Sequence, residues 1–450
     1  MHRRDVATEV LTQAIVRYAV ERLRLDPPPL DNSRPEADLR AMAGRTITPD
    51  GIGGLEALRI FADVLAPSCI STDHPRFFAF VPVAPTEAAM LFDLVVGSSA
   101  LYGGSWLEGA GAVFAENEAL RWLADLAGFP PGAGGVFVSG GSAANLSALT
   151  AARYRWRLGR PDRETVRGAV LASAAAHSSV VAAARVMDAD VIEVPAGAAG
   201  QLTAQALRRA EDELDLDRAF AVVATAGTTN AGVVDDLDAA ADAAEGLGVW
   251  LHVDGAYGLA GLAAPSVRHL FIGIDRADSF VVDPHKWLFA PYDCAALLYR
   301  DPAIARATFT QHAEYLEVLN ERHDWNPSDY AYHLSRRARG LPFWFSLATY
   351  GTQAYQDAIE ATLTLTRDAA ELIRVTPHLE LLVEPELSVV MFRRVGWTST
   401  DYHAWSDRLL TEGTAFVVPT TWDGEAVLRC CFVNPLTTVD DVRVVFDSLA

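Results

Sequence analysis

Short apolar runs that alternate with helical patterns between residues 136 and 300 constrain the fold of this chain most strongly. The runs cover residues 136–138, 169–172, 190–194, 221–226, 249–253 and 279–282. This alternation predicts a parallel sheet with helices on both faces, and in such sheets ligands bind at the carboxyl ends of the strands. A polar or glycine-containing cluster follows each run. We therefore expect an α/β fold with a ligand site along that edge.

The rest of the chain is expected to add an arm and a second domain. Helical spacing that stops before the prolines at 27–29, and a second helix at 54–65, predict an N-terminal helical arm over residues 1–68. Residues 69–340 are expected to form the large domain, which ends with an antiparallel strand at 295–299 and a polar, mobile loop over the ligand site at about 306–335. A helix that starts at Arg336 and the segments 387–392, 402–410, 415–419, 427–433 and 439–449 predict a small C-terminal α+β domain over residues 341–450.

The charge and the cysteines restrict the kinds of partner. The net charge is -21 and no basic block with interleaved aromatic residues occurs, which argues against nucleic acid or an anionic membrane as a partner. The 4 cysteines form no CxxC pair and no zinc-ligand spacing, so we expect no metal site and interpret them as reduced core residues of a cytoplasmic protein. We expect no secretion signal and no membrane span, because no 18-residue apolar run occurs. A small molecule is the expected partner.

Lys286 is the only lysine of the chain, since all the other residues among the 37 Lys and Arg are arginine. An arginine stays protonated, whereas burial can deprotonate a lysine amine, which can then attack a carbonyl carbon. Lys286 follows a strand-like apolar run and does not lie in a charged helix. We therefore predict a Schiff-base lysine; the alternative is a surface lysine kept by chance.

Other strand ends carry candidate ligand-binding groups. Residues 139–142 (Ser-Gly-Gly-Ser) lie at a strand-to-helix junction, where backbone amides and a hydroxyl favour an anion such as a cofactor phosphate. They match neither the Walker A motif nor the GxSxG nucleophile elbow. Asp254 ends an apolar run, and a buried carboxylate there would pair with a cation or a protonated nitrogen, unless it only caps the next helix. His177 and Thr229 also follow strands, with a core histidine and an ordinary turn as the alternatives.

Two aromatic segments precede the sheet. Phe80 and Pro82 belong to the segment 74–82, and Tyr102 and Gly104 belong to the segment 102–106. Aromatic residues usually lie in a core, but these could form the wall of a ligand pocket. An anion cradle, an aromatic wall, a buried acid and a single amine are together what pyridoxal phosphate needs for its phosphate, ring face, pyridine nitrogen and aldehyde. Pyridoxal phosphate is therefore the predicted cofactor.

Several motifs resemble those of the group II pyridoxal-phosphate decarboxylases, the family of the aromatic-amino-acid, histidine and glutamate decarboxylases. The segment 283–288 (Asp-Pro-His-Lys-Trp-Leu), with Pro291 and Asp293-Cys294, resembles the signature of that family. The segments 74–77, 141–143, 176–179, 227–229, 252–254 and 433–435 match further family motifs in the same order, from about residue 70 to the C-terminus. The resemblance implies a fold-type-I enzyme, like aspartate aminotransferase, and an obligate homodimer with a swapped N-terminal arm and shared active sites.

The resemblance also implies roles for individual residues. Lys286 would form the internal aldimine, Asp254 would pair with the pyridine nitrogen, and His177 would stack on the cofactor ring. The residues expected around the phosphate and the ring are Ser142, Ala143, Ala144, His285, Thr229 and Ala256. Tyr330 resembles the catalytic-loop tyrosine that protonates the product from the neighbouring subunit. Tyr332 is its rival, because the segment that follows Tyr330 is shorter than in the animal enzymes.

The expected reaction is decarboxylation of an L-amino acid, of the tryptophan, tyrosine or phenylalanine type, to its amine and CO2. Thr72 and Gly104 match positions of bulky aromatic residues in the animal aromatic-amino-acid decarboxylases, which leaves room for an indole. Phe80 and Pro82 keep an apolar pocket wall, and Tyr102 is expected to line the pocket with them.

Asp283 departs from the family pattern, because an asparagine is common at this position near the phosphate. A second anion beside a phosphate is unexplained at this stage. The alternatives that stay open are a decarboxylase of a non-aromatic amino acid, an aldehyde synthase of the same family, an aminotransferase, and a catalytically silent protein that binds pyridoxal phosphate.

Overall fold

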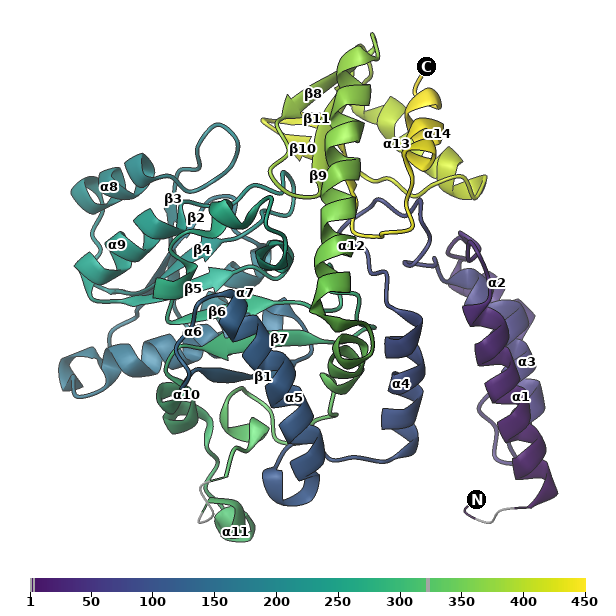
Figure 1. Cartoon of the computed structure of the whole chain (residues 1–450), viewed down its shortest axis with the longest axis horizontal. Helices are drawn as coiled ribbons and strands as arrows, with labels where there is room; N and C mark the ends of the chain where they lie inside the picture. The colour runs from purple at the N-terminus through teal and green to yellow at the C-terminus, as the bar shows by residue number, and fades with distance from the viewer. Residues whose placement is uncertain (1, 3–4, 321–323) are drawn as a thin grey trace.

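The computed structural model describes residue 2, residues 5–320 and residues 324–450, and a seven-stranded sheet lies in its larger part (Figure 1). The strand order is β1-β7-β6-β5-β4-β2-β3, in which β7 runs antiparallel to both of its neighbours. The strands are β1 (Gly134–Val138), β2 (Ala169–Ser173), β3 (Asp190–Val194), β4 (Ala219–Thr225), β5 (Trp250–Asp254), β6 (Ser279–Val282) and β7 (Ala295–Tyr299). This mostly parallel sheet confirms the predicted α/β fold, and its parallel strands end along one edge.

Helices cover both faces of this sheet. One face carries α6 (Gly141–Arg157), α7 (Ser178–Val186) and α10 (Pro302–Phe309). The other face carries α5 (Trp106–Leu126), α8 (Ala204–Glu213), α9 (Leu237–Leu247) and the first part of α12 (Leu341–Val375). Val138 is buried in the first core and its neighbour Phe137 in the second. Because successive strand side chains point to opposite faces, a strand covered on both faces must be apolar throughout, as β1 is.

A four-stranded antiparallel sheet forms the C-terminal part, with the order β10-β11-β9-β8. It consists of β8 (Leu379–Val383), β9 (Val389–Arg394), β10 (Pro419–Trp422) and β11 (Glu425–Cys431), packed with α13 (Ser399–Thr411), α14 (Val439–Asp447) and the end of α12. The strand predicted at 415–419 is wrong, since β10 begins at Pro419. The apolar pattern there reflects the burial of Ala415 and Val417. The backbone of this segment makes only an isolated bridge and no regular strand.

The segment around Phe78 joins this smaller sheet, although we predicted it within the large domain. The Phe78 N–H donates to the Phe416 carbonyl at 2.9 Å, and the Cys431 N–H donates to the Phe78 carbonyl at 3.0 Å. The Phe78 ring lies edge-on to Phe432, with 5.0 Å between the ring centroids. The aromatic segment 74–82 therefore links the smaller sheet to the rest of the chain.

The predicted catalytic loop leads from α10 to α12 and contains the short helix α11 (Glu317–Asn320); its residues 321–323, with His323, lie outside the described residues. Arg336 does not start α12 as predicted, because its guanidinium is buried against α5. It forms two hydrogen bonds to Glu116, of 2.7 and 2.8 Å, and the Glu116 carboxylate also accepts the Gly340 N–H at 2.8 Å. α12 begins at Leu341 and is interrupted at Gly351, whose φ is 78°. This buried ion pair fixes the end of the loop to the large domain.

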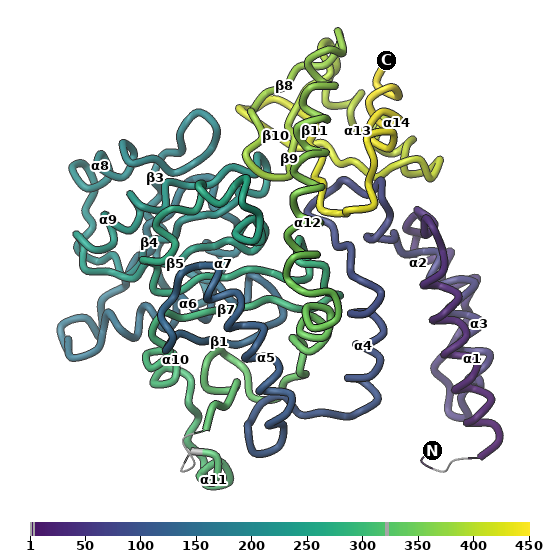
Figure 2. Tube along the Cα trace, in the orientation of Figure 1, coloured from purple at the N-terminus to yellow at the C-terminus, as the bar shows by residue number. Residues whose placement is uncertain are grey.

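The N-terminal arm, drawn in purple, extends away from the sheet (Figures 1 and 2). It consists of α1 (Val6–Leu23), α2 (Glu36–Ala43) and α3 (Gly54–Ile60), which continues as a π-helical segment to Leu65. No residue of α1 or α2 is buried. Helix α4 (Glu87–Ser98) packs on α12 and lies between α12 and the arm in Figure 1. In the described part of the chain, a search for a helix able to span a bilayer finds none.

Candidate active site

A cavity of about 550 Å³ lies at the carboxyl ends of the parallel strands. It is lined by the residues that follow β1, β2, β4, β5 and β6, and by residues of the segments 80–81 and 418–429. The predicted site residues that line it are Phe80, Ser142, His177, Thr229, Asp254, Ala256, His285 and Lys286. The fold therefore brings most of the predicted cofactor site together from separate loops.

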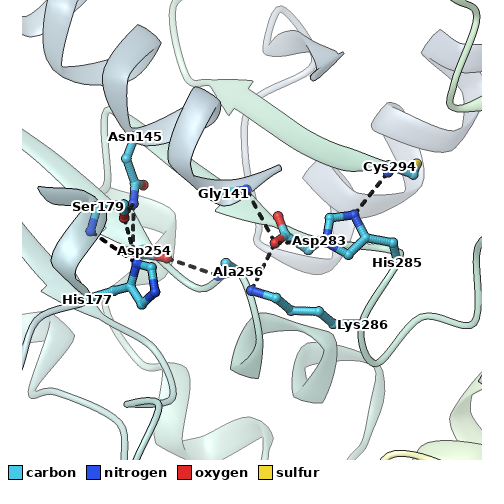
Figure 3. Close-up of polar contacts among 10 residues, drawn as sticks. All are labelled: Gly141, Asn145, His177, Ser179, Asp254, Ala256, Asp283, His285, Lys286 and Cys294. Atoms are coloured by element: carbon cyan, nitrogen blue, oxygen red, sulfur yellow. Dashed lines mark hydrogen bonds and ion pairs between the residues drawn. The ribbon is translucent and has the colours of Figure 1, made fainter. Parts of the chain in front are cut away.

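Lys286 lies in the loop after β6, and its amine points to Asp283 (Figure 3). Lys286 Nζ lies 2.9 Å from Asp283 Oδ2, and 26% of the lysine side chain is exposed. Burial lowers the pKa of Lys286, but the charge and the hydrogen bond of Asp283 outweigh burial and raise that pKa above its ordinary value. The ion pair thus favours the protonated amine.

The start of α6 is open at its helix N-terminus. A Cβ on Gly141 would lie 3.0 Å from Ala256 Cβ and 3.3 Å from Asp283 Oδ2, so glycine leaves space that a side chain would fill. The Gly141 N–H donates to Asp283 Oδ2 at 3.3 Å, and Ser142 lines the cavity beside it. Backbone N–H groups and the helix dipole favour an anion at such a position.

Ala143 and Ala144 follow Ser142 in the first turn of α6 and do not line the cavity. Their N–H groups donate to the Gly140 carbonyl at 3.0 and 3.1 Å, inside the first turn of the helix. A contact of these two residues with a phosphate stays a prediction.

Asp254 ends β5 and is 5% exposed. Its Oδ2 accepts a hydrogen bond from Asn145 Nδ2 at 2.7 Å, and its Oδ1 accepts the Ala256 N–H at 3.2 Å. Among the described residues, no cationic side chain forms an ion pair with Asp254. Two neutral donors stabilise the carboxylate, so a protonated nitrogen of a ligand in the cavity would supply the cation that Asp254 lacks among the described residues.

His177 caps the N-terminus of α7 and also lines the cavity. Its Nδ1 lies 2.8 Å from Ser179 Oγ and accepts the Ser179 N–H at 3.2 Å. His285 lies on the side of Asp283, where its Nδ1 accepts the Cys294 N–H at 2.9 Å. Burial lowers the pKa of His285, which favours its neutral form. Both histidines are therefore held in fixed orientations by backbone groups.

The two loop tyrosines lie in different environments. Tyr330 is 2% exposed and stacks on Trp325, with 4.1 Å between the ring centroids, and its carbonyl accepts the Tyr299 hydroxyl at 3.0 Å. Burial raises the pKa of Tyr330. Tyr332 is 83% exposed. Neither tyrosine lines the cavity of its own chain.

Of the five predicted substrate-pocket residues, Phe80 lines the cavity, while Thr72, Pro82, Tyr102 and Gly104 do not. The Tyr102 hydroxyl donates to the Leu334 carbonyl at 2.9 Å, and a Cβ on Gly104 would lie 2.3 Å from Tyr102 Oη. Tyr102 and Gly104 therefore pack against the end of the catalytic loop. Their role in a substrate pocket stays a prediction.

Sequence reasoning missed two residues of the site. Asn145 is fully buried on α6 and holds Asp254. Arg429 is 5% exposed on β11 and lines the cavity. Each had a detectable signal: a polar side chain on the alanine-rich buried face of a helix, and a charged residue inside an apolar strand.

A parallel sheet with an anion cradle, a buried acid, a histidine and a lysine at its carboxyl edge defines a fold-type-I pyridoxal-phosphate enzyme. The comparison with protein families agrees, since the pyridoxal-dependent decarboxylase conserved domain matches residues 55–395. The chain therefore belongs to the pyridoxal-dependent decarboxylase family, as its motifs predicted.

Relatives in this family have different substrates. The aromatic-L-amino-acid decarboxylase of Bacillus atrophaeus is 32% identical over 418 residues, which cover 90% of this chain and 86% of that protein. The L-2,4-diaminobutyrate decarboxylase of Rhizobium meliloti is 32% identical over 393 residues, which cover 84% of this chain and 77% of that protein. The solved structure of Oryza sativa TDC with PLP and tryptamine has a TM-score of 0.91 at 25% identity, over 100% of this chain and 98% of that one.

The chain is thus a pyridoxal-phosphate-dependent carboxy-lyase that acts on an amino acid. The residues present fit the cofactor: the glycine at the N-terminus of α6 leaves room for its phosphate, no cation of the described chain pairs with Asp254, and Lys286 presents an amine to the same cavity. One oxygen of Asp283, Oδ1, is buried without a hydrogen-bond donor among the described residues.

Proposed function

We propose that the protein decarboxylates an aromatic L-amino acid to the amine and CO2. The observation that supports this most directly is the distribution of charge and apolar surface in the cavity. Its apolar lining is Phe80, Val81, Tyr292, Val418 and Pro419. An aromatic-amino-acid and a diaminobutyrate decarboxylase are both 32% identical to this chain, so the proposal rests on the cavity.

The carboxylates of the cavity argue against a second ammonium group on the substrate. Among the described lining residues, the carboxylates are Asp254 and Asp283. Asp254 is proposed to hold the cofactor nitrogen, and Asp283 already pairs with Lys286. A diaminobutyrate side chain would therefore bury its ammonium without a free carboxylate, at a cost of several kcal/mol. An uncharged aromatic side chain has no such requirement.

Arg429 supports binding of the substrate carboxylate. Its Nη1 donates to the Phe80 carbonyl at 2.7 Å, whereas Nε and Nη2 are buried without an acceptor among the described residues. A buried guanidinium without a counter-charge is unfavourable, so an anion in the cavity would stabilise it. The carboxylate of an amino acid is such an anion, and we propose that Arg429 orients it.

We assign each step of the proposed reaction to a residue of the chain. When bound, pyridoxal phosphate supplies an electron sink for the bond to the departing CO2. Asp254 would hold the ring nitrogen of the cofactor in its protonated form, and His177 would lie against the ring. Lys286 would hold the aldehyde carbon of the cofactor until the substrate amine takes its place. A tyrosine of the catalytic loop returns a proton to the α-carbon, with Tyr330 and Tyr332 as the candidates.

We also propose that two copies of the chain form a homodimer. Apolar side chains that a soluble monomer would normally bury are exposed on the arm and on α4; they are Val6, Val10, Ile15, Val16, Leu91, Leu94 and Val95. A second copy that covers these faces is consistent with the shared sites that the family resemblance implies. Because Tyr102 and Gly104 lie away from their own cavity, a role for them in substrate binding requires the cavity of the second copy.

Replacing Lys286 by Ala tests the assignment of the reactive amine. The variant should lose the visible absorbance of the bound cofactor together with CO2 release from L-tryptophan, because the chain has no other lysine. Absorbance spectra and CO2 release of the wild type and the variant are the measurements. An active Lys286→Ala protein would contradict the assignment.

A further inference from the structure

Asn145 connects the two residues proposed to hold the cofactor ring. It lies on α6 and is fully buried, with Asp254, Ser179 and His252 around its amide (Figure 3 shows all but His252). Its Nδ2 lies 2.7 Å from Asp254 Oδ2 and 2.8 Å from Ser179 Oγ, and its Oδ1 lies 2.9 Å from His252 Nε2. All the polar atoms of the amide are therefore used.

Asn145 Oδ1 can only accept, so it fixes the direction of the hydrogen bonds at the far end of this network, because His252 Nε2 must donate to it. Trp250 Nε1 can only donate, and it donates to Ser279 Oγ at 2.7 Å. The Ser279 hydroxyl can then donate to His252 Nδ1, which lies 2.8 Å away. A neutral His252 carries its proton on Nε2 and donates it to Asn145 Oδ1. Burial lowers the pKa of His252 to about 4, which agrees with a neutral ring.

This direction continues through Asn145 to the cavity. With Oδ1 occupied as an acceptor, the two N–H bonds of Nδ2 point to Asp254 and Ser179. The Ser179 hydroxyl, which accepts one of them, donates its own proton to His177 Nδ1 at 2.8 Å. Together with the Ser179 backbone N–H, this hydroxyl keeps Nδ1 of His177 as an acceptor, so the proton of a neutral ring lies on Nε2, and Asp254 accepts a hydrogen bond from the same amide.

We propose that Asn145 is a positioning residue that donates a hydrogen bond to Asp254 and orients the Ser179 hydroxyl towards His177, so that one amide positions both groups that face the cofactor ring. The inference rests on the roles proposed for Asp254 and His177. It adds that these two groups are coupled, because the Asn145 amide contacts Asp254 directly and His177 through the Ser179 hydroxyl.

Substitution of Asn145 by Asp tests this coupling with almost no change in size. The carboxylate can still accept the His252 N–H, but its second oxygen would face Asp254 and the two acids would have to share a proton. The titratable groups around this position are His252 and Asp254 on β5, His177 before α7 and Lys286 after β6. Asp254 would then pair less well with a protonated ring nitrogen.

The first readout is the equilibrium binding of pyridoxal 5'-phosphate to the cofactor-free protein, without any amino acid. Asn145→Asp should raise the dissociation constant about tenfold or more, the effect of losing a hydrogen bond to a carboxylate, and more at pH 6, where the two acids share a proton, than at pH 8. Thr150→Val is the matched control, because Thr150 lies on the same helix and bonds the Leu146 carbonyl at 2.7 Å, outside the network. Asn145→Asp protein that binds the cofactor as tightly as this control at both pH values would overturn the proposal.

The second readout is the tautomer of His177, measured from the imidazole nitrogen shifts of protein labelled with 15N-histidine. In the wild type the proton should lie on Nε2. Ser179→Ala removes the hydroxyl donor to His177 Nδ1 and leaves the backbone N–H of residue 179 in place. The Nδ1 shift should therefore change while the proton stays on Nε2, even if Asn145→Asp does not fold. An unchanged His177 signal in Ser179→Ala would contradict the coupling. Both readouts omit the substrate, so a protein that passes them but leaves aromatic amino acids intact would refute only the proposed substrate.

Discussion

Asp283 is the residue that the sequence left unexplained, and its contacts suggest what it does. Its Oδ2 accepts hydrogen bonds from Lys286 Nζ and from the Gly141 N–H, so the carboxylate lies at the helix N-terminus where a phosphate is expected. His285 Nε2 lies 3.5 Å from the same oxygen. A bound phosphate would therefore meet a fixed negative charge, and the charge of Asp283 also keeps Lys286 protonated.

Asp283→Asn should make cofactor uptake less dependent on high pH. Asp283 raises the pKa of Lys286, so in the wild type the neutral amine that attacks the aldehyde forms only at higher pH. Without that charge, the pH at which uptake is half-maximal should fall by roughly one unit, which corresponds to about 1.4 kcal/mol of charge interaction. The measurement is the rate at which cofactor-free protein gains visible absorbance with pyridoxal 5'-phosphate, as a function of pH.

Asp293→Asn is the control for this experiment. Asp293 lies in the same loop, but it pairs with Arg339 and not with Lys286. Its removal should leave the pH dependence of uptake unchanged. If cofactor uptake by Asp283→Asn has the same pH dependence as uptake by the wild type, Asp283 does not set the pKa of the Lys286 amine.

At the scale of elements, the catalytic loop between α10 and α12 is fixed at its C-terminal end by the ion pair of Arg336 and Glu116. Between its two candidate tyrosines, the structure gives Tyr332 an exposed hydroxyl, whereas Tyr330 stacks in a core. A hydroxyl that serves the cavity of a second copy must be accessible. The predicted role of Tyr330 is untested, and exposure favours Tyr332.

Tyr332→Phe should therefore shift the product from the amine to the aldehyde, as the family resemblance implies for loss of the loop tyrosine. Tyr330→Phe keeps the stacking on Trp325 and should still form mainly the amine. Chromatography of the products from one aromatic substrate, with oxygen uptake, separates these outcomes. If the aldehyde comes from Tyr330→Phe instead, Tyr330 is the proton donor and the loop must rearrange in the dimer.

At the scale of the whole molecule, the exposed apolar faces of the arm and α4 predict a dimer. Leu94 on α4 is 49% exposed, and a charge there would be buried by a second copy. Leu94→Glu should therefore give a monomer with little activity, whereas the wild type should have twice the mass of one chain. Light scattering during size-exclusion chromatography measures both masses.

Ile272→Glu is the matched control, because Ile272 is 67% exposed but lies on neither the arm nor α4. This variant should remain dimeric and active. A wild type that is monomeric, or a Leu94→Glu protein that stays dimeric, would remove these faces from the interface.

The fold could be predicted from the sequence where an element shows a local apolar pattern. It was missed where burial depends on residues that are distant in the sequence. The strands β1, β2, β4 and β6 are mostly apolar runs, so their positions could be predicted from local pattern alone. The residues 415–418 are equally apolar, but only Ala415 and Val417 are buried, and Phe416 makes an isolated bridge and a ring contact with the distant Phe77 in place of a regular strand. Helix α5 was not predicted, and Gly109 within it has a non-helical φ of -134°.

The site shows the same limit. Motifs at the strand ends identified Lys286, Asp254, His177 and Thr229, which line one cavity in the structure. Asn145 and Arg429 were missed, since each contacts its partners across a large sequence separation: Asn145 reaches His252, and Arg429 reaches Phe80. Their importance follows only from the side chains that the fold places beside them.

CO2 release from single amino acids tests the central claim most directly. The cofactor-loaded protein should release CO2 from L-tryptophan, L-tyrosine or L-phenylalanine with a kcat/KM at least about a hundredfold above that for L-2,4-diaminobutyrate. Such a ratio corresponds to about 3 kcal/mol for an ammonium that finds no free carboxylate. The amines tryptamine, tyramine or phenethylamine should appear in equal amount to the CO2. A protein that prefers L-2,4-diaminobutyrate, or that releases CO2 from none of the aromatic amino acids, would contradict the account.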